Sequence, residues 1–190
     1  SLASPIAVSV AATASRNPIC VGAVDTFRAV TIAGVSGQTY QWFKNNVLIS
    51  GATDSVYITS SLANNDQIEV VMTGGGPCVS GSPATSNVIT LTVNPLPNVT
   101  VNQPSVCSGN TATLTANGAS TYTWSGGLPN GASVTTPVLT APASYLVTGT
   151  DANGCRDTAT ANVSILPNPN VSVNSPTICS GNTATLTANG

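Results

Sequence analysis

The sequence predicts an all-β protein built from tandem β-sandwich domains, and three observations support this fold class. The segment CSGNTATLTANG occurs at residues 107–118 and recurs letter for letter at 179–190. The period, from Cys107 to Cys179, is longer than the usual solenoid or propeller repeat and fits one small domain per repeat. Short segments rich in Val, Ile and Thr alternate apolar with polar residues, and turn residues separate them at roughly 8–12-residue spacing, which is typical of a sandwich. No helical periodicity extends beyond one turn.

Two proline-containing segments predict the domain boundaries. They are NPLP at residues 94–97 and LPNP at residues 166–169. Because proline restricts φ and favours an extended chain, each segment reads as a short, semi-rigid linker. The predicted domains are therefore residues 1–94, residues 95–166, and an incomplete start of a third repeat at 167–190. The absence of a leader-like segment at the start predicts a mature or excised piece of a protein.

The first domain shows the strand pattern most clearly in its middle. TYQWFKNNVLI at 39–49 predicts a hairpin that turns at Asn45–Asn46. Residues 66–73 predict a strand with Ile68, Val70 and Met72 on one face, because alternate residues of a strand point to the same side. Further segments complete the expected set: a half-buried strand over 6–10, a strand over 27–32, a strand and corner over 55–66, a turn at GGGP 74–77, and a last strand over 87–93.

The second domain repeats this order with shorter segments. Val99 and Val101 begin it, and TATLTA at 111–116 places Ala112, Leu114 and Ala116 inward. The expected strands that follow cover 121–124, 133–139, 144–150 and 158–165, with a DANGC turn at 151–155 before the last one. The two domains share Cys-x-Gly at the second strand, Thr-Tyr-x-Trp at the third, and a second cysteine before the last strand. The shared order predicts two copies of one architecture.

The composition excludes several functional classes. Charged residues make up 5% of the chain, against roughly 25% in an average soluble domain. The four cationic residues are scattered singly, so no basic stripe for nucleic acid is present. No apolar run approaches the roughly 18 residues of a membrane-spanning segment. Thr, Ser and Asn must therefore supply the polar surface, and neither a nucleic acid partner nor a membrane span is expected.

The five cysteines predict disulfide-closed domains in an oxidising, extracellular setting. The expected pairs are Cys20 with Cys78 in the first domain and Cys107 with Cys155 in the second, each bridging one end of its sandwich. In the chain-entropy model, a bridge of this loop length contributes at most about 4 kcal/mol. Cys179 is equivalent to Cys107, and its expected partner lies one full period after Cys155, beyond the printed sequence. Cys179 is therefore expected to be unpaired because of truncation.

No catalytic, cofactor or metal site is predicted. Without histidine there is no Ser-His or Cys-His pair, and the six acidic residues are dispersed where a glycosidase needs two facing each other. Asp151, Asn153 and Asp157 around the DANGC turn offer oxygen ligands for calcium, but a tight turn with few carboxylates is the favoured interpretation. Trp42 and Trp124 are interpreted as core residues in preference to sugar-stacking platforms.

CSGNTATLTANG, the TYxW strand and SYLVTGTDANGC together resemble the Ig-like/PKD-like tandem repeats of giant cell-surface proteins of Bacteroidota. The first domain resembles a sister repeat of the same arrays, so the resemblance covers essentially the whole chain. It implies long extracellular stalks and filaments, including SprB-like gliding-motility adhesins exported by type IX secretion. It also implies O-glycosylation at Asp-Ser/Thr followed by an apolar residue, a pattern that makes Ser55 and Thr158 candidate sites.

These observations predict a structural or adhesive segment of a large extracellular repeat protein, without enzymatic activity. The expected partners are neighbouring repeats of the same chain, other copies in a fibre, and a surface polysaccharide. An alternative from another class is an accessory carbohydrate-binding module of a secreted enzyme; exposed aromatic residues would favour it and two buried tryptophans would count against it. If the third repeat is incomplete in the native protein, its strands are expected to complete a sandwich in another molecule by strand addition.

Overall fold

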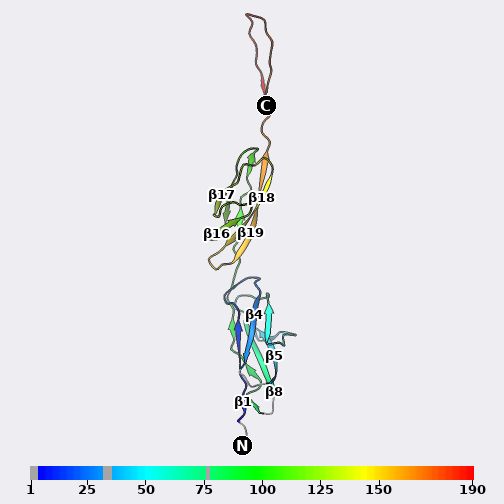
Figure 1. The fold of residues 1–190 in the computed structure, drawn as a ribbon, viewed down its shortest axis with the longest axis vertical. Coiled ribbons are helices and arrows are strands. Elements are labelled where there is room, and N and C mark those ends of the chain that lie inside the picture. Colours follow the sequence, from blue (N-terminus) through cyan, green and yellow to red (C-terminus); the bar gives the residue numbers. More distant parts are fainter. Residues whose placement is uncertain (1–3, 32–35, 76–77) are drawn as a thin grey trace. The chain divides into compact units, whose positions relative to one another are not determined.

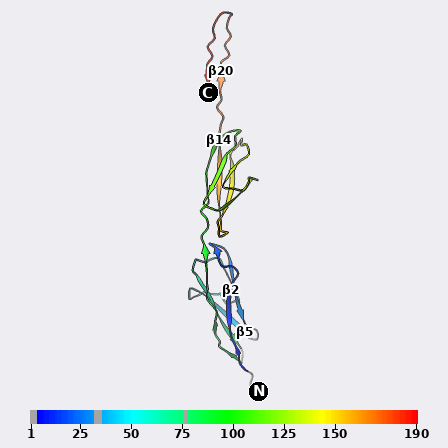
Figure 2. The ribbon, with the colours of Figure 1, turned by 90° about the vertical axis from the view of Figure 1, so that its left-hand side faces the viewer.

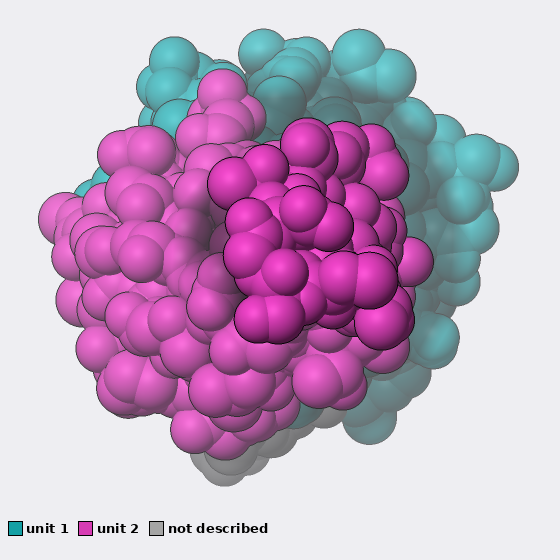
Figure 3. Space-filling view, turned by 90° about the horizontal axis from the view of Figure 1, so that it is seen from above, with its two compact units in different colours: residues 1–96, 153–155 teal, residues 97–152, 156–190 magenta. Residues whose placement is uncertain are grey.

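The computed structural model describes residues 4–31, 36–75 and 78–190, and all regular structure within them is β-strand. The predicted all-β class is therefore confirmed. By its contacts the chain divides into two compact units (Figure 3). Unit 1 comprises Ser1–Leu96 with Asn153–Cys155, and unit 2 comprises Pro97–Ala152 with Arg156–Gly190. The finer ranges 1–94, 95–166 and 167–190 stay a prediction.

Unit 1 is a sandwich of two antiparallel layers (Figures 1 and 2). One layer has the order β2-β4-β7, and the other has the order β10-β8-β5-β6 with β11 also paired to β8. Two short parallel pairs, β1 with β9 and β3 with β12, join the first and last segments of the unit. The strands are β1 (Ile6–Ala7), β2 (Val10–Ala14), β3 (Ile19–Cys20), β4 (Asp25–Thr31), β5 (Ser36–Lys44), β6 (Val47–Leu48), β7 (Val56–Thr59), β8 (Gln67–Gly75), β9 (Val79–Ser80), β10 (Ala84–Thr85), β11 (Ile89–Thr90) and β12 (Val93–Asn94).

The core of unit 1 follows the alternation in its sequence. Ile68, Val70 and Met72 on β8 are fully buried, as predicted. The predicted Asn45–Asn46 turn is confirmed: both residues have positive φ, 53° and 62°, and Phe43 pairs with Leu48 across it. Asparagine tolerates this conformation well, which explains why the turn falls there. Of the other predicted segments, Ile32 and the second half of the GGGP turn lie outside the described residues.

Unit 2 repeats the architecture with fewer strands. Its layers have the orders β13-β15-β17 and β14-β19-β18-β16. As in unit 1, an early strand runs parallel to the last one, here β14 beside β19. The strands are β13 (Thr100–Val101), β14 (Ser105–Cys107), β15 (Thr113–Asn117), β16 (Thr121–Trp124), β17 (Ser133–Thr135), β18 (Ala143–Thr150) and β19 (Arg156–Leu166).

The core of unit 2 also matches the predicted inward positions. Ala112, Leu114 and Ala116 are at most 2% exposed, and Val147 and Val163 pack in the same cluster. The backbone of Gly118 lies very close to the backbone of Asn98. A Cβ on Gly118, which has φ of 94°, would lie 1.8 Å from the Asn98 carbonyl oxygen. Only glycine fits there, because the backbone leaves no room for a side chain.

Residues 167–190 form one open hairpin, in which β20 (Ser172–Val173) pairs with β21 (Ala188–Asn189) and every residue is exposed. In this part of unit 2 Ser172 pairs with Asn189 and Val173 with Ala188, whereas between β13 and β15 Thr100 pairs with Asn117 and Val101 with Ala116. Every partner is displaced by one period of the sequence repeat. The repeated sequence therefore specifies the same strand register even where no core is present to support it.

Candidate functional site

The most informative chemical feature of the described residues is a disulfide that joins Cys20 to Cys155. The S–S distance is 2.01 Å, the Cα atoms are 5.6 Å apart, and 135 residues separate the two cysteines in sequence. Both fall in unit 1, which takes in residues 153–155 although the strands on either side of them belong to unit 2. The predicted pairs Cys20–Cys78 and Cys107–Cys155 are therefore wrong. Cys78, Cys107 and Cys179 are exposed free thiols.

The strand topology of unit 2 explains why Cys107 and Cys155 do not pair. Cys155 immediately precedes β19, whose first residue is Arg156. Cys107 pairs in register with Leu166, the last residue of the same strand. An eleven-residue strand spans about 35 Å, far beyond the roughly 4.4–6.8 Å that a disulfide allows between Cα atoms. The two cysteines lie at opposite ends of the sandwich.

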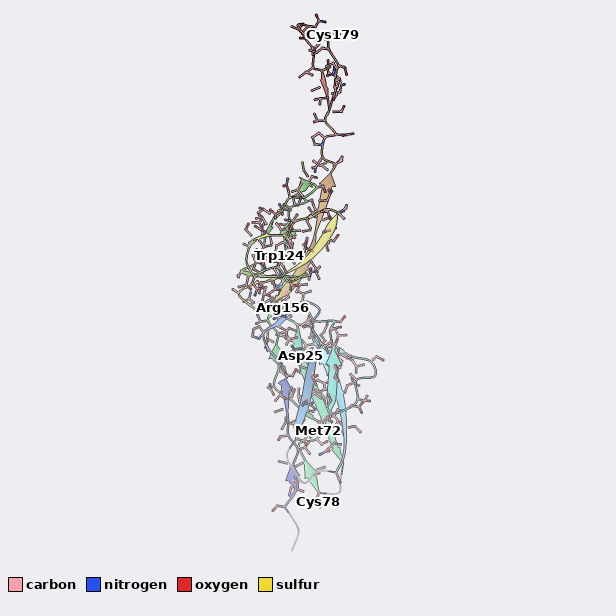
Figure 4. All side chains as sticks on the ribbon, turned by 45° about the horizontal axis from the view of Figure 1, so that its top comes forward. Asp25, Met72, Cys78, Trp124, Arg156 and Cys179 are labelled. Atoms are coloured by element: carbon pink, nitrogen blue, oxygen red, sulfur yellow. A yellow bond between two sulfur atoms is a disulfide. The ribbon has the colours of Figure 1, made fainter. Side chains whose placement is uncertain are left out.

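Unit 1 separates its cysteines in the same way. Cys78 lies beside the start of the described chain, since its carbonyl oxygen accepts a hydrogen bond from the Ile6 amide at 2.8 Å. Cys20 pairs in register with Asn94, at the end of the last strand of the unit. Figure 4 shows Cys78 at the end of unit 1 away from Asp25. The sequence placed both cysteines at strand ends, but only the fold shows that the ends are opposite ones.

The turn after the first cysteine of each repeat is built identically three times. The amide three residues on donates to the cysteine carbonyl: Ala23 to Cys20 at 3.0 Å, Asn110 to Cys107 at 3.1 Å and Asn182 to Cys179 at 3.2 Å. The glycine in each turn has positive φ: Gly22 at 77°, Gly109 at 89° and Gly181 at 90°. Glycine adopts this conformation without steric cost, which accounts for the shared Cys-x-Gly. We call Cys20, Cys107 and Cys179 the first-turn cysteines.

An amide side chain before Cys20, and another before Cys107, bonds to the backbone near the end of the same sandwich. In unit 1 Asn17 donates to the Thr90 carbonyl at 2.9 Å and accepts from the Thr92 amide at 2.9 Å. In unit 2 Gln103 donates to the Thr160 carbonyl at 2.9 Å and accepts from the Asn162 amide at 2.6 Å. Proline follows each amide residue, and proline has no backbone N–H to donate to the neighbouring strand. The clamps differ by one residue in spacing, with Asn17 three residues before Cys20 and Gln103 four residues before Cys107.

The other two cysteines also occupy equivalent positions. Cys78 lies between β8 and β9, and Cys155 lies between β18 and β19. Each therefore comes after a long strand, β8 or β18, and immediately before the next one; β19 is the last strand of its sandwich, whereas β10, β11 and β12 still follow β9 in unit 1. We call Cys78 and Cys155 the last-turn cysteines. The observed disulfide joins a first-turn cysteine of the first repeat to a last-turn cysteine of the second.

Both tryptophans are core residues, as predicted. Trp42 is fully buried and its indole N–H donates to the Asp54 carbonyl at 2.9 Å. Trp124 is 8% exposed and donates to the Gly131 carbonyl at 2.9 Å. Trp42 also packs with Phe27 and Tyr57, whose ring centroids lie 6.4 Å and 6.0 Å from that of Trp42. Neither indole is available as a sugar-stacking platform.

Asp66 has a structural role at the corner before β8. Its carboxylate accepts hydrogen bonds from the Ala63 amide at 2.9 Å and the Asn45 side chain at 2.8 Å, and Lys44 lies 3.0 Å away. Burial alone would raise the pKa of Asp66, but these hydrogen bonds and the Lys44 charge outweigh burial and lower the pKa below its usual value of 3.8. The group is therefore a buried anchor of the corner and not a proton donor near neutral pH.

Asp25 is the other buried acid, at 1% exposed. Its Oδ1 accepts hydrogen bonds from the Ser15 hydroxyl, the Arg16 amide at 3.2 Å and the Thr26 amide at 2.8 Å. Its Oδ2 is buried without a partner among the described residues. One carboxylate oxygen thus ties the end of β2 to the start of β4.

The described residues contain no cluster of three or more His, Cys, Asp or Glu side chains that could hold a metal ion. Among the surface hollows, the one lined by residues 49–54 and 56–58 contains a single carboxylate, Asp54. The two further hollows, beside Tyr122 and beside Lys44, contain no acidic residue. Across the ranges that the structure describes, we find no helix with the length and apolar character needed to cross a bilayer.

The candidate glycosylation sites are both accessible. Ser55 and Thr158 are exposed, the first immediately before β7 and the second within β19. The Thr158 amide donates to the Asp157 carboxylate at 2.8 Å, so its backbone conformation is held locally. Their modification stays a prediction.

Reasoning from the sequence missed that the disulfide joins cysteines of two successive repeats. The sequence shows that Cys20 and Cys107 are equivalent and that Cys78 and Cys155 are equivalent. Equivalence alone is compatible with pairing within a repeat or with pairing between successive repeats. The choice between them depends on the pairing of Cys107 with Leu166, at the far end of β19 from Cys155, and that pairing comes from the fold.

Comparison with known proteins found solved structures and one family model to which the chain is similar. Three solved structures similar to the chain are each 16% identical to it. An outer capsid protein domain set of bacteriophage RB49 has a TM-score of 0.44, covering 88% of this chain and 61% of its own. A 1.5-MDa bacterial ice-binding adhesin has 0.46, with 86% and 66% covered, and a Ca²⁺-stabilised ice-binding adhesin of an Antarctic bacterium has 0.46, with 91% and 52% covered.

The chain thus spans between about half and two thirds of the length of these three structures, and similarities of this size carry no functional argument. No curated protein matches the chain. One family model matches a single repeat of the chain, the second one. Residues 96–169 match the model described as "Ig-like domain CHU_C associated".

Proposed function

We propose that this chain is a structural segment of an extracellular stalk or filament, built from Ig-like repeats and without catalytic activity. The observation that carries the proposal is the covalent bond from Cys20 to Cys155, across 135 residues of sequence. A bond between successive repeats limits how far the chain can extend when it is pulled from its ends. Such a bond is useful in a protein that bears load and persists in an oxidising, extracellular compartment.

The distribution of side chains supports a structural role. The residues best suited to binding or chemistry serve the fold: both tryptophans pack in the cores, and Asp66 and Asp25 anchor corners. The surface is composed largely of uncharged polar residues, and only 5% of all residues are charged. With few charges to screen, the stability of the segment is expected to depend little on salt concentration.

The resemblance in sequence refines the proposal. We infer a giant cell-surface protein of the gliding-adhesin type, exported by type IX secretion, with Ser55 and Thr158 carrying O-glycans. The resemblance of the repeats and the exposure of both hydroxyl residues support this. The carbohydrate-binding alternative has less support, because both tryptophans are buried.

The experiment that tests the proposal is surface labelling of intact source cells with antibodies raised against this chain. We expect labelling without permeabilisation, and a band far above 18.9 kDa on reducing, denaturing gels. Labelling that needs permeabilisation would overturn the extracellular assignment. Retardation of the chain in gels containing soluble polysaccharide would instead favour the carbohydrate-binding alternative. If the chain binds no polysaccharide, its migration should be the same with and without polysaccharide in the gel.

A further inference from the structure

Two of the free thiols, Cys107 and Cys78, occupy the same kinds of turn as the two bonded cysteines. Cys107 is a first-turn cysteine, built like Cys20, but it is exposed and unpaired. Cys78 is a last-turn cysteine, like Cys155, and it too is exposed and unpaired. The structure thus contains one complete pair between successive repeats and three unpaired halves: the first-turn cysteines Cys107 and Cys179 and the last-turn cysteine Cys78.

We propose that the Cys20–Cys155 bond is one instance of a rule: each first-turn cysteine bonds the last-turn cysteine of the repeat that follows it. Cys107 is then a covalent attachment site for a following repeat, and Cys78 is one for a preceding repeat. The partner is another Ig-like repeat that presents a cysteine in the turn before its last strand. The inference rests on the proposed function only in requiring a neighbouring repeat.

Three features make Cys107 equivalent to Cys20 as one half of this bond. Both are followed by the same turn, closed by a hydrogen bond to the cysteine carbonyl at 3.0–3.1 Å. Both are preceded by an amide clamp, from Asn17 to Thr90 at the end of β11 or from Gln103 to Thr160 in β19. Both pair with the residue at which the predicted linker begins, Asn94 for Cys20 and Leu166 for Cys107. A first-turn thiol therefore lies where the chain leaves its own repeat.

Strand geometry excludes the competing arrangement. In unit 2 Cys107 and Cys155 lie at opposite ends of β19, about 35 Å apart. In unit 1 the segment from β9 to β12 lies between Cys78 and Asn94, the residue that pairs with Cys20. A disulfide needs Cα atoms within roughly 7 Å of each other. Pairing within a repeat would therefore require the sandwich to unfold, whereas pairing with the next repeat leaves both folds intact.

The chemistry requires an oxidant. The two thiols lose two protons and two electrons as the S–S bond forms, and a disulfide oxidant accepts them and becomes a dithiol or a pair of thiols. Exchange proceeds through a mixed disulfide between the oxidant and one protein thiol, which the second protein thiol then displaces. An accessible thiolate is needed for the first attack, and the exposure of Cys107 provides access.

The test completes the third repeat and maps its disulfides. The full chain is extended after Gly190 with a copy of residues 119–168, because Gly190 corresponds to Gly118 in the repeat. The extended chain contains one added last-turn cysteine, the copy of Cys155. It is refolded with oxidised and reduced glutathione, the remaining thiols are alkylated, and the non-reduced digest is analysed by mass spectrometry.

We expect two linked peptides, one joining Cys20 to Cys155 and one joining Cys107 to the added cysteine, with Cys78 and Cys179 alkylated. A link from the added cysteine to Cys179, which would lie within its own repeat, would overturn the rule. So would alkylation of both Cys107 and the added cysteine, or a mixture of pairings in which Cys107 has no preference.

Two serine variants separate the proposal from nonspecific oxidation. Cys107→Ser should leave the added cysteine alkylated while the Cys20–Cys155 link remains. Cys179→Ser is the matched control, since it removes a first-turn thiol of the same sequence context, and it should leave both links in place. Because the test measures pairing in the purified chain, its failure would not bear on whether the native protein lies at the cell surface.

Discussion

Pulling the chain from its two ends should reveal which cysteines are joined. The Cys20–Cys155 bond excludes 135 residues from extension. At about 3.4 Å per extended residue, this hides about 460 Å of contour length. The oxidised chain should therefore reach only about 190 Å when fully unfolded, and the Cys20→Ser variant about 650 Å.

Single-molecule force spectroscopy measures these lengths directly. The chain is held through tags at its termini, and remaining thiols are alkylated before pulling so that no new pair forms. Cys78→Ser is the control, because it removes an exposed, unpaired thiol and should leave the short contour unchanged.

The competing arrangement has a different contour length. Bonds from Cys20 to Cys78 and from Cys107 to Cys155 would exclude two shorter loops, 20–78 and 107–155, from extension. The oxidised chain would then extend to about 290 Å. A contour near that length, or a full-length contour before reduction, would refute the pairing and the mechanical argument built on it. The observed loop of 135 residues contributes about 5 kcal/mol in the chain-entropy model, so reduction should also lower the thermal midpoint.

Three further predictions concern stability and modification. Gly118→Ala should destabilise unit 2 by at least about 2 kcal/mol more than Gly109→Ala in chemical denaturation, because both have positive φ but only Gly118 faces a backbone oxygen, that of Asn98; equal losses would refute the close approach. Asp66→Asn should lower the free energy of unfolding near neutral pH, with Asp54→Asn as the exposed, charge-matched control. The folded pKa of Asp66 lies below 3.8, so its contribution to stability is fully present above about pH 4 and is lost as pH falls through the folded pKa. The difference in free energy of unfolding between wild type and Asp66→Asn should therefore disappear in acid. A difference that grows in acid would contradict the assignment. Peptides containing Ser55 and Thr158 from the native protein should carry glycan mass, and unmodified masses at both would remove the glycosylation proposal.

The strands and cores could be derived from the sequence because their causes are local. The alternation of Ile68, Val70 and Met72 identifies a buried strand face, and all three are fully buried. Asn45–Asn46 marks a turn because few other residues tolerate its backbone conformation. The letter-for-letter repeat also predicts the register of the hairpin at 167–190, which matches its counterpart one period earlier in the chain.

The candidate site was only partly accessible by the same reasoning. The sequence identified every cysteine and matched each with its counterpart in the other repeat, yet it assigned the partners within repeats. It also identified Trp42 and Trp124 as core residues, because a Trp on this strand is typically buried in a sandwich of this kind. It gave no indication that Asn17 and Gln103 clamp the strands of the first-turn cysteines, because amide side chains of this kind have no distinctive spacing.

By itself the sequence determined the fold class, the strand faces, the turns and the equivalence of the repeats, because period-two patterning and turn chemistry act over a few residues. Only the tertiary structure decided which cysteines meet. Pairing depends on which end of a sandwich each strand end reaches, and that is set by the direction and length of the last strand and by its parallel partner. Cys107 and Cys155 are the closer pair in sequence but lie about 35 Å apart along β19, whereas Cys20 and Cys155 are 135 residues apart and covalently joined.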